Sequence, residues 1–208
     1  MENIKNLLFD LGGVIMDIRR ENCVAAFEKL GLKDASSYFG DYGQHGVFMA
    51  LERGDIGPAE FHVELHKKLP AEVTDQQIDD AFNKFLIGIP PHRLAELEKL
   101  AERFNLCLLS NTNIIMWDSK IKHDFEICGR KREDYFPGGM VTSFEANALK
   151  PELKIFRYTA ETLGIKPEET LFLDDSQANL DSAARLGFKT AHVPTDSEFG
   201  DIIRNLNI

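Results

Sequence analysis

Four short apolar segments, each followed by polar residues, constrain the fold of this chain more than any other feature. The segments are residues 7–9, 106–109, 171–173 and 190–193. Their hydrophobicity is continuous rather than alternating, which is typical of strands buried on both faces of a parallel sheet. In the second half of the chain these apolar segments alternate with amphipathic stretches of helical length, at about 91–103, 152–163 and 177–186. This alternation predicts an α/β protein with a doubly wound, Rossmann-like parallel sheet.

Residues 18–89 break this rhythm, because they show helical periodicity and contain no convincing strand. Helices are expected there at about 21–31, 47–53, 59–69 and 74–85. The proline pair at 90–91 marks the return to alternating strands and helices. We therefore predict a small all-helical insertion, residues 18–89, after the first strand, and an α/β core made of residues 1–17 and 90–208.

Charge and composition exclude several classes of function. The chain has 208 residues, a formal net charge of −10 and no basic stripe, which argues against a nucleic-acid partner and against an anionic membrane surface. No apolar run has the length of a membrane span, and the first residues lead into a strand rather than a signal peptide. We expect a cytoplasmic protein, either a monomer or a weak dimer. Cys23, Cys107 and Cys128 share no metal-ligand spacing and are expected to be buried apolar residues.

Polar side chains follow three of the apolar segments. Asp10 comes after the first and precedes the glycine pair 12–13, Ser110 and Asn111 follow the second, and the pair Asp174–Asp175 follows the third. The carboxyl ends of parallel strands lie at one edge of the sheet, where open α/β sheets bind ligands, so we expect these side chains to meet. Taken singly, each has a plainer interpretation, such as a turn at Asp10 or a loop or helix cap after the second segment.

Asp174 and Asp175 are adjacent carboxylates, which repel each other unless a cation or basic group lies between them. Mg²⁺ is the natural cation, because it prefers hard oxygen ligands and is often held by one or two carboxylates. Asn179 could orient the acidic pair or only stabilise the turn. Lys150, which precedes Pro151 at the start of a helix, could neutralise a carboxylate or an anionic intermediate. The alternatives are a helix N-cap for the acidic pair and a solvated side chain for the lysine.

These residues form four motifs in order, at residues 9–14, 109–111, 150–151 and 174–179. In this order they resemble the four motifs of the haloacid dehalogenase-like superfamily of hydrolases, and the resemblance covers essentially the whole chain. The insertion is similar to the small helical cap of that superfamily's first cap class. Within the superfamily the chain looks closest to sugar-phosphate phosphatases related to glucose-1-phosphate phosphatase. It is less similar to the phosphatase domain of soluble epoxide hydrolase.

The resemblance implies a magnesium-dependent phosphatase that hydrolyses a small phosphorylated metabolite, with sugar phosphates favoured, through an aspartyl-phosphate intermediate. Asp10 would be the nucleophile, while Ser110, the Asn111 backbone and Lys150 would bind the phosphoryl group and screen its charge. The implied metal ligands are Asp10, the Gly12 backbone carbonyl and Asp175, with Asp174 as a further or outer ligand.

The chain departs from most phosphatases of this superfamily at Gly12, where they carry a second aspartate as general acid and base. Acid–base assistance contributes about 10²–10⁴-fold to rates, although relatives of glucose-1-phosphate phosphatase also have glycine here. Asp17 is a candidate substitute acid, the alternative being a hinge or helix-capping residue. The polar segment 40–46, in which Asp41 and His45 carry hydrogen-bonding groups, is a candidate contact for the leaving group or an ordinary interhelical loop.

Three other functions remain open on these residues. Dehalogenation of 2-haloacids would use the same aspartate, but a metal-free attack on carbon does not need the pair Asp174–Asp175. A phosphomutase would need a proton shuttle that Gly12 does not supply. A non-enzymatic binding or regulatory module, or a weakly active one, is the third alternative, and Gly12 is its main support.

Overall fold

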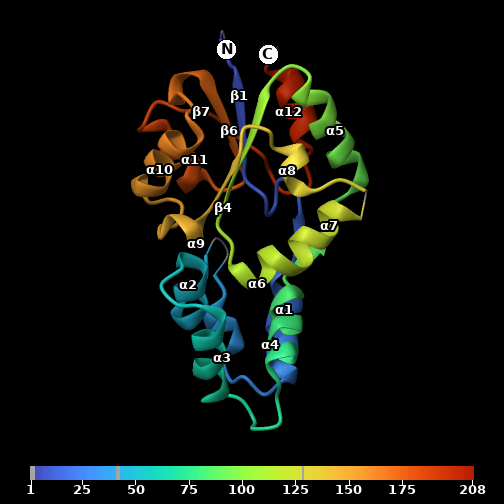
Figure 1. The fold of residues 1–208 in the computed structure, drawn as a ribbon, viewed down its shortest axis with the longest axis vertical. Helices are drawn as coiled ribbons and strands as arrows, with labels where there is room; N and C mark the ends of the chain where they lie inside the picture. The colour runs from blue at the N-terminus through green and yellow to red at the C-terminus, as the bar shows by residue number, and fades with distance from the viewer. Residues whose placement is uncertain (1–2, 41–42, 128) are drawn as a thin grey trace.

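The computed structural model describes residues 3–40, 43–127 and 129–208. Its centre is a parallel sheet in the order β5-β4-β1-β6-β7, so that the first strand lies in the middle (Figure 1). The strands are β1 Asn6–Phe9, β4 Asn105–Ser110, β5 Met140–Thr142, β6 Thr170–Asp174 and β7 Lys189–His192. The predicted doubly wound parallel sheet is confirmed, and all four predicted strands belong to it.

Helices cover both faces of this sheet, and successive residues of β1 point to opposite faces. Leu7 and Phe9 lie on the face of the sheet that α5 (Pro91–Ala101) and α12 (Phe199–Asn205) cover, and the centroid of the Phe9 ring lies 5.2 Å from that of Phe199. Leu8 lies on the opposite face, which α10 (Leu153–Leu163) and α11 (Gln177–Ala184) cover. Because strands are covered on both faces, their sequences are apolar without alternation.

The insertion forms a second lobe at the opposite end from the chain termini (Figure 1). Its elements are α1 Arg20–Lys29, η1 Ala35–Tyr38, α2 Gly46–Arg53, α3 Pro58–His66 and α4 Asp75–Asn83. Thr74 forms the capping box that begins α4, and Pro58 opens α3. Five buried phenylalanines give the lobe an aromatic core, with ring centroids 4.7–6.2 Å apart. They are Phe27, Phe39, Phe48, Phe61 and Phe82.

Two short strands connect the insertion to the core. β2 (Asp17–Ile18) pairs antiparallel with β3 (Leu86–Gly88), at the points where the chain enters and leaves the insertion. The expectation of no strand within residues 18–89 is therefore wrong here. Segments of two and three residues are too short to show periodicity, so the pairing has no signal in the sequence.

Smaller elements complete the structure between the strands of the sheet. After β4 come α6 Ile114–Met116, the π-helical turn η2 Trp117–Ile121, α7 Lys122–Glu126 and α8 Arg132–Tyr135; α9 Ser143–Ala146 follows β5, and η3 Pro167–Glu169 precedes β6. Cys23 and Cys107 are buried as expected, whereas Cys128 lies outside the described residues.

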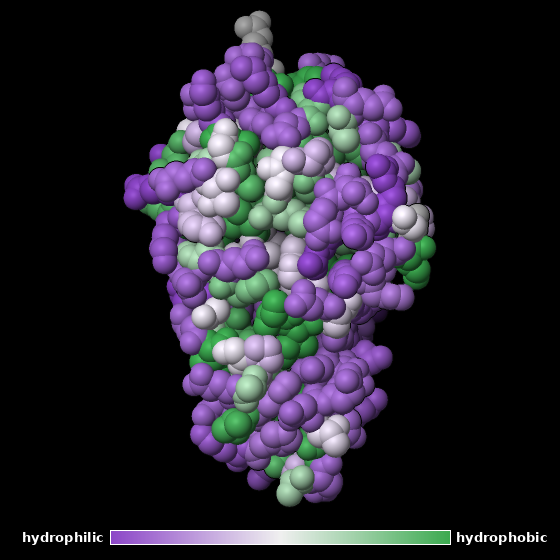
Figure 2. Space-filling model, in the orientation of Figure 1, coloured by the Kyte–Doolittle hydropathy of each residue, from purple (hydrophilic) through white to green (hydrophobic). Residues whose placement is uncertain are grey.

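The surface is mostly hydrophilic on the face shown in Figure 2, where apolar residues gather chiefly near the boundary between the two lobes. Among the helices of the described residues, none combines the length and the apolar character needed to cross a membrane.

Candidate active site

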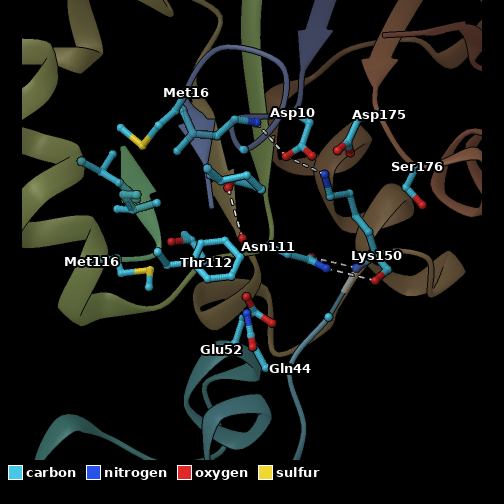
Figure 3. Close-up of a pocket in the computed structure, with 18 of the residues that line it drawn as sticks. Asp10, Met16, Gln44, Glu52, Asn111, Thr112, Met116, Lys150, Asp175 and Ser176 are labelled. Carbon is cyan, nitrogen blue, oxygen red and sulfur yellow. Dashed lines mark hydrogen bonds and ion pairs between the residues drawn. The ribbon is translucent and has the colours of Figure 1, made fainter. Parts of the chain in front are cut away.

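The carboxyl ends of β1, β4 and β6 converge on one cavity of about 100 Å³ (Figure 3). The core contributes Asp10, Ser110, Asn111, Lys150 and Asp175 to its lining, and the insertion contributes residues from the opposite side. The structure thus brings together side chains that are up to 165 positions apart in sequence, because the central position of β1 places its end between those of β4 and β6. A cavity of this size fits a small molecule rather than a macromolecule.

Lys150 is the central cation of this site. Its Nζ lies 2.8 Å from Asp10 Oδ1 and 2.7 Å from Asp174 Oδ2, and only 4% of the residue is exposed. Burial alone would lower the pKa of Lys150, but the two carboxylates outweigh burial and raise it. The ammonium group therefore remains charged and neutralises carboxylates that would otherwise repel each other.

The Asn111 side chain fixes the backbone of Lys150. Its Oδ1 accepts a hydrogen bond from the Lys150 N–H at 2.9 Å, and its Nδ2 donates to the Lys150 carbonyl at 3.0 Å. Sequence reasoning expected Asn111 at the site but did not predict this contact with Lys150. Ser110, 2% exposed, lies beside it at the end of β4, and its Oγ is 3.4 Å from the Asn111 carbonyl oxygen.

Asp174 is fully buried, and each of its carboxylate oxygens has a protein partner. Oδ2 accepts from Lys150, while Oδ1 accepts from the Ser176 backbone N–H at 2.8 Å and from Asn179 Nδ2 at 2.9 Å. Asn179 thus contacts the acidic pair directly. With its oxygens engaged in this way, Asp174 is suited to orient Lys150.

Asp10, Asp174 and Asp175 can each offer an oxygen to one ion, since these oxygens lie within 4.8 Å of one another. Carboxylate oxygens are the hard ligands that Mg²⁺ prefers, so the carboxylates of Asp10 and Asp175 fit magnesium, whereas the oxygens of Asp174 are engaged by the protein. Burial raises the pKa of Asp10 to about 8, with Asp174 and Asp175 adding to the effect and Lys150 opposing it. Burial, followed by the charge of Asp174, also raises the pKa of Asp175. A divalent cation would favour the ionised forms of both groups.

The two glycines after Asp10 differ in what the backbone demands of them. Gly13 has a φ of +77°, and a Cβ there would overlap Asp175 Oδ2, so the close approach of Asp175 requires glycine. Gly12 lines the cavity, and a Cβ there would meet only the Ile18 side chain, at an ordinary 3.5 Å. The fold therefore leaves room for a side chain at position 12.

Asp17, the candidate substitute acid, is not brought together with these residues. Its Oδ1 accepts a hydrogen bond from Arg93 Nη1 at 2.7 Å, and it is absent from the described lining of the cavity. Arg93 also makes a bidentate contact with Glu198, at 2.9 and 3.0 Å. The ion pair with Arg93 holds the Asp17 carboxylate at the base of the insertion, away from the described lining of the cavity, and its role as a substitute acid stays a prediction.

Gln44 and Glu52 line the cavity from the insertion; Gln44 lies in the segment that the sequence predicts as a contact, whereas sequence reasoning missed Glu52. Both are buried, with 8% and 6% of the residue exposed. Burial raises the pKa of Glu52 to about 7, opposed by Lys150 and by a hydrogen bond from the Gln44 backbone. A signal existed for Glu52, because it lies four residues after Phe48 on the buried face of α2. Gln44 belongs to the predicted contact segment 40–46, of which residues 41–42 lie outside the described residues.

Comparisons with known proteins agree with this geometry. A family model for haloacid dehalogenase-like hydrolases matches residues 4–187. D-ribitol-5-phosphate phosphatase of Bacteroides thetaiotaomicron is 34% identical over 187 residues, which cover 90% of each chain. A haloacid dehalogenase family enzyme of the same organism, solved with magnesium and inorganic phosphate, is 40% identical with a TM-score of 0.89, over 97% of this chain and 100% of that one.

A more distant structure, the L-2-haloacid dehalogenase PA0810, is 17% identical with a TM-score of 0.61, over 92% of this chain and 85% of that one. This likeness shows a shared fold alone. The described site combines a buried aspartate at a strand end, a lysine bridging two carboxylates and a third carboxylate suited to a metal. Such a site can place an anionic substrate next to a nucleophile while screening the charges of both.

Proposed function

The chain belongs to the haloacid dehalogenase-like hydrolase family, and from this premise we propose that it is a magnesium-dependent phosphatase acting on phosphates of small sugars or polyols. The observation that carries the proposal is Lys150, held at 2.8 Å from Asp10 and at 2.7 Å from Asp174 beside the carboxylate of Asp175. The D-ribitol-5-phosphate phosphatase that resembles it over 90% of both chains supports the substrate class.

Asp10 is proposed to attack the phosphorus atom and form an aspartyl-phosphate as the P–O bond to the leaving group breaks, and the leaving oxygen takes up a proton from solvent to give the alcohol. Water then attacks the aspartyl-phosphate, which releases inorganic phosphate and restores the carboxylate. Ser110 and the backbone of Asn111 would bind the phosphoryl oxygens, because both lie at the end of β4 in the same cavity. Their positions are fixed before substrate binds, so little reorganisation accompanies the reaction.

Lys150 is proposed to screen the negative charges of Asp10 and the phosphoryl group, which would otherwise repel each other. The Asn111 side chain holds its backbone, and Asp174 holds its ammonium group. Asp10, Asp175 and the Gly12 carbonyl would hold Mg²⁺, which supplies Lewis-acid charge neutralisation when bound. Asp174 would act from outside this ligand set, because its oxygens are engaged by the protein.

The two lobes are proposed to divide the reaction between them. The core, residues 1–17 and 90–208, would carry the phosphoryl chemistry, and the insertion, residues 18–89, would cover the leaving group. Support comes from the cavity lining, in which Asp10 and Lys150 face Gln44 and Glu52 (Figure 3). Closure of such a lobe excludes water from the phosphoryl group.

A phosphatase screen tests this function. Phosphates of sugars, polyols and simple alcohols are incubated with the protein in Mg²⁺ or in EDTA, and released phosphate is measured. We expect turnover that needs Mg²⁺ and that Asp10→Asn abolishes. The matched control is Asp118→Asn, an exposed aspartate in η2, which should turn over like the unaltered protein. Turnover by Asp10→Asn would contradict the covalent mechanism, and no turnover of any phosphomonoester would contradict the function.

A further inference from the structure

Gln44 and Glu52 each place an unpartnered oxygen in the site from the side of the insertion (Figure 3). Among the described residues, Gln44 Oε1 and Glu52 Oε2 have no hydrogen-bond partner, although both side chains are more than nine-tenths buried. A buried polar atom without a partner destabilises the folded protein, because it loses its hydrogen bonds to water and gains none in return. Among the described side chains, these two are the buried polar atoms that lack a partner, and both lie in one cavity. They mark a place where a ligand would complete the hydrogen bonding.

The chemistry of the two atoms selects the kind of ligand. The Gln44 oxygen is an amide acceptor, and the Glu52 oxygen is an acceptor when the carboxyl group is ionised and a donor when it is protonated, so a hydroxyl group, which both donates and accepts, can satisfy either atom. A second phosphate or a carboxylate would meet the acidic Glu52 side chain and two acceptor oxygens. Hydroxyl groups on neighbouring carbons supply the required donors without bringing an anionic charge into the site.

The backbone of Glu52 is anchored to the loops that hold the phosphate site. Ser143 Oγ donates to the Glu52 carbonyl at 2.7 Å, and the same Oγ accepts from the Thr112 N–H at 3.0 Å. Thr112 directly follows Ser110 and Asn111, the proposed phosphoryl ligands. Glu52 is therefore fixed relative to the phosphoryl site, on the side from which the leaving alcohol would enter.

We propose that Gln44 and Glu52 form a hydroxyl-binding subsite for the leaving group, which selects phosphates of polyols and sugars over phosphates of simple alcohols. This inference rests on the proposed phosphatase function and adds the residues that recognise the alcohol. Each lost hydrogen bond to a hydroxyl group lowers selectivity by about three- to tenfold.

The test compares D-ribitol 5-phosphate with ethyl phosphate, which has no free hydroxyl group on its carbon chain. Glu52→Met and Gln44→Met remove the acceptor oxygens but keep unbranched side chains of similar length, so the fold should persist. We expect each variant to lower the ratio of kcat/KM for D-ribitol 5-phosphate to that for ethyl phosphate by about three- to tenfold. Glu60→Met, at an exposed position of α3, is the matched control and should leave the ratio unchanged.

Binding to Asp10→Asn protein provides a readout that does not need turnover. In that protein, D-ribitol 5-phosphate should bind at least tenfold more tightly than ethyl phosphate by calorimetry, and adding Glu52→Met should reduce this preference. Equal binding of the two phosphates, or a preference that both methionine substitutions leave unchanged, overturns the subsite. Binding of 3-aminopropyl phosphate more tightly than D-ribitol 5-phosphate also overturns the proposed subsite, since Gln44 and Glu52 would then select a cation rather than hydroxyl groups. No turnover by the unaltered protein with the binding preference intact would instead refute the phosphatase function.

Discussion

Replacing Lys150 with methionine tests the electrostatic design of the site through folding stability. The substitution removes the ammonium group that contacts Asp10 and Asp174 at 2.8 and 2.7 Å, and it preserves most of the apolar stem. The two carboxylates then remain buried next to Asp175 without that cation. Losing one partner of a buried ion pair destabilises proteins by about 3–5 kcal/mol.

Proton uptake limits the size of this loss. A carboxyl group with an ordinary pKa of 3.8 can be protonated at pH 7 for about 4 kcal/mol, since each pH unit corresponds to about 1.4 kcal/mol. Lys150 lowers the pKa of Asp10 and of Asp175, so without it the folded-state pKa values of these two carboxyls rise further above their unfolded values, and Asp175 can take up a proton below pH 7. A carboxyl group whose folded pKa is raised stabilises the fold at low pH, and this stabilisation is lost as pH rises. The loss of unfolding free energy caused by Lys150→Met should therefore shrink below pH 7, by about 1.4 kcal/mol per pH unit for each proton that the folded variant binds and the unaltered folded protein does not.

Urea unfolding of the unaltered and variant proteins measures this effect. In EDTA, Lys150→Met should lose about 3–5 kcal/mol of unfolding free energy at pH 7 and clearly less at pH 5.5. Adding Mg²⁺ at a hundred times its dissociation constant should stabilise the variant by about 2.7 kcal/mol, because an ion that binds only the folded state shifts the folding equilibrium by mass action. Lys68→Met, at an exposed lysine just after α3, is the matched control. It should change the unfolding free energy by less than about 0.5 kcal/mol, as is usual for surface substitutions.

Two results would refute this reasoning. A loss below about 1 kcal/mol at pH 7 would mean that the carboxylates do not need the lysine. A large loss that is independent of pH would point to a packing defect at position 150 rather than to uncompensated charge. Hydrolysis of a small phosphomonoester, measured in parallel, should fall by at least 10²-fold, as expected when one preorganised electrostatic contact is removed.

Three further predictions concern the acid–base groups around the cavity. Gly12→Asp should raise kcat for an alkyl phosphate by about 10²-fold or more, because the site has room for the side chain and lacks an assigned acid; a steady-state assay that shows no gain would indicate another proton donor. Asp17→Asn should keep kcat within about twofold and lower stability by about 1 kcal/mol through loss of its half-exposed ion pair with Arg93; a large fall in kcat would restore Asp17 as the acid. The pKa of Glu52 is about 7 in the folded protein against an ordinary value of 4.5. The stability that its protonated form contributes is therefore fully present below pH 4.5 and is lost as pH rises to 7, a fall in unfolding free energy of up to about 3 kcal/mol. Thermal unfolding should therefore show Glu52→Met gaining stability over the unaltered protein at pH 8 but not at pH 4.5, and a pH-independent difference would contradict the buried-acid interpretation.

The parallel sheet could be predicted from sequence because it depends on local patterns. Strands buried on both faces must be apolar throughout, and segments such as 106–109 and 171–173 meet that requirement. A parallel sheet brings its carboxyl strand ends to one edge, so Asp10, Ser110 and the acidic pair could be expected to meet. The topology thus converts three local motifs into one site.

Contacts that join distant segments without a repeating pattern could not be predicted. The pair β2–β3, the ion pair between Asp17 and Arg93, and the hydrogen bonds between Asn111 and Lys150 each depend on how the lobes and loops come together. Glu52 is an intermediate case. Its spacing from Phe48 predicts a buried face, but the cavity on that face exists only in the folded chain.

The position of Glu52 relative to the phosphate site depends on a neutral hydroxyl group rather than on an ion pair. Ser143 Oγ connects the Glu52 carbonyl to Thr112, and both ends of this link are buried backbone groups. Because the link carries no charge, salt and pH act on it weakly, whereas the carboxyl group of Glu52 responds to pH. Recognition of the leaving group should therefore change with pH through the protonation of Glu52 while the spacing between subsites stays fixed, and the phosphoryl chemistry around Lys150 would follow a separate pH dependence.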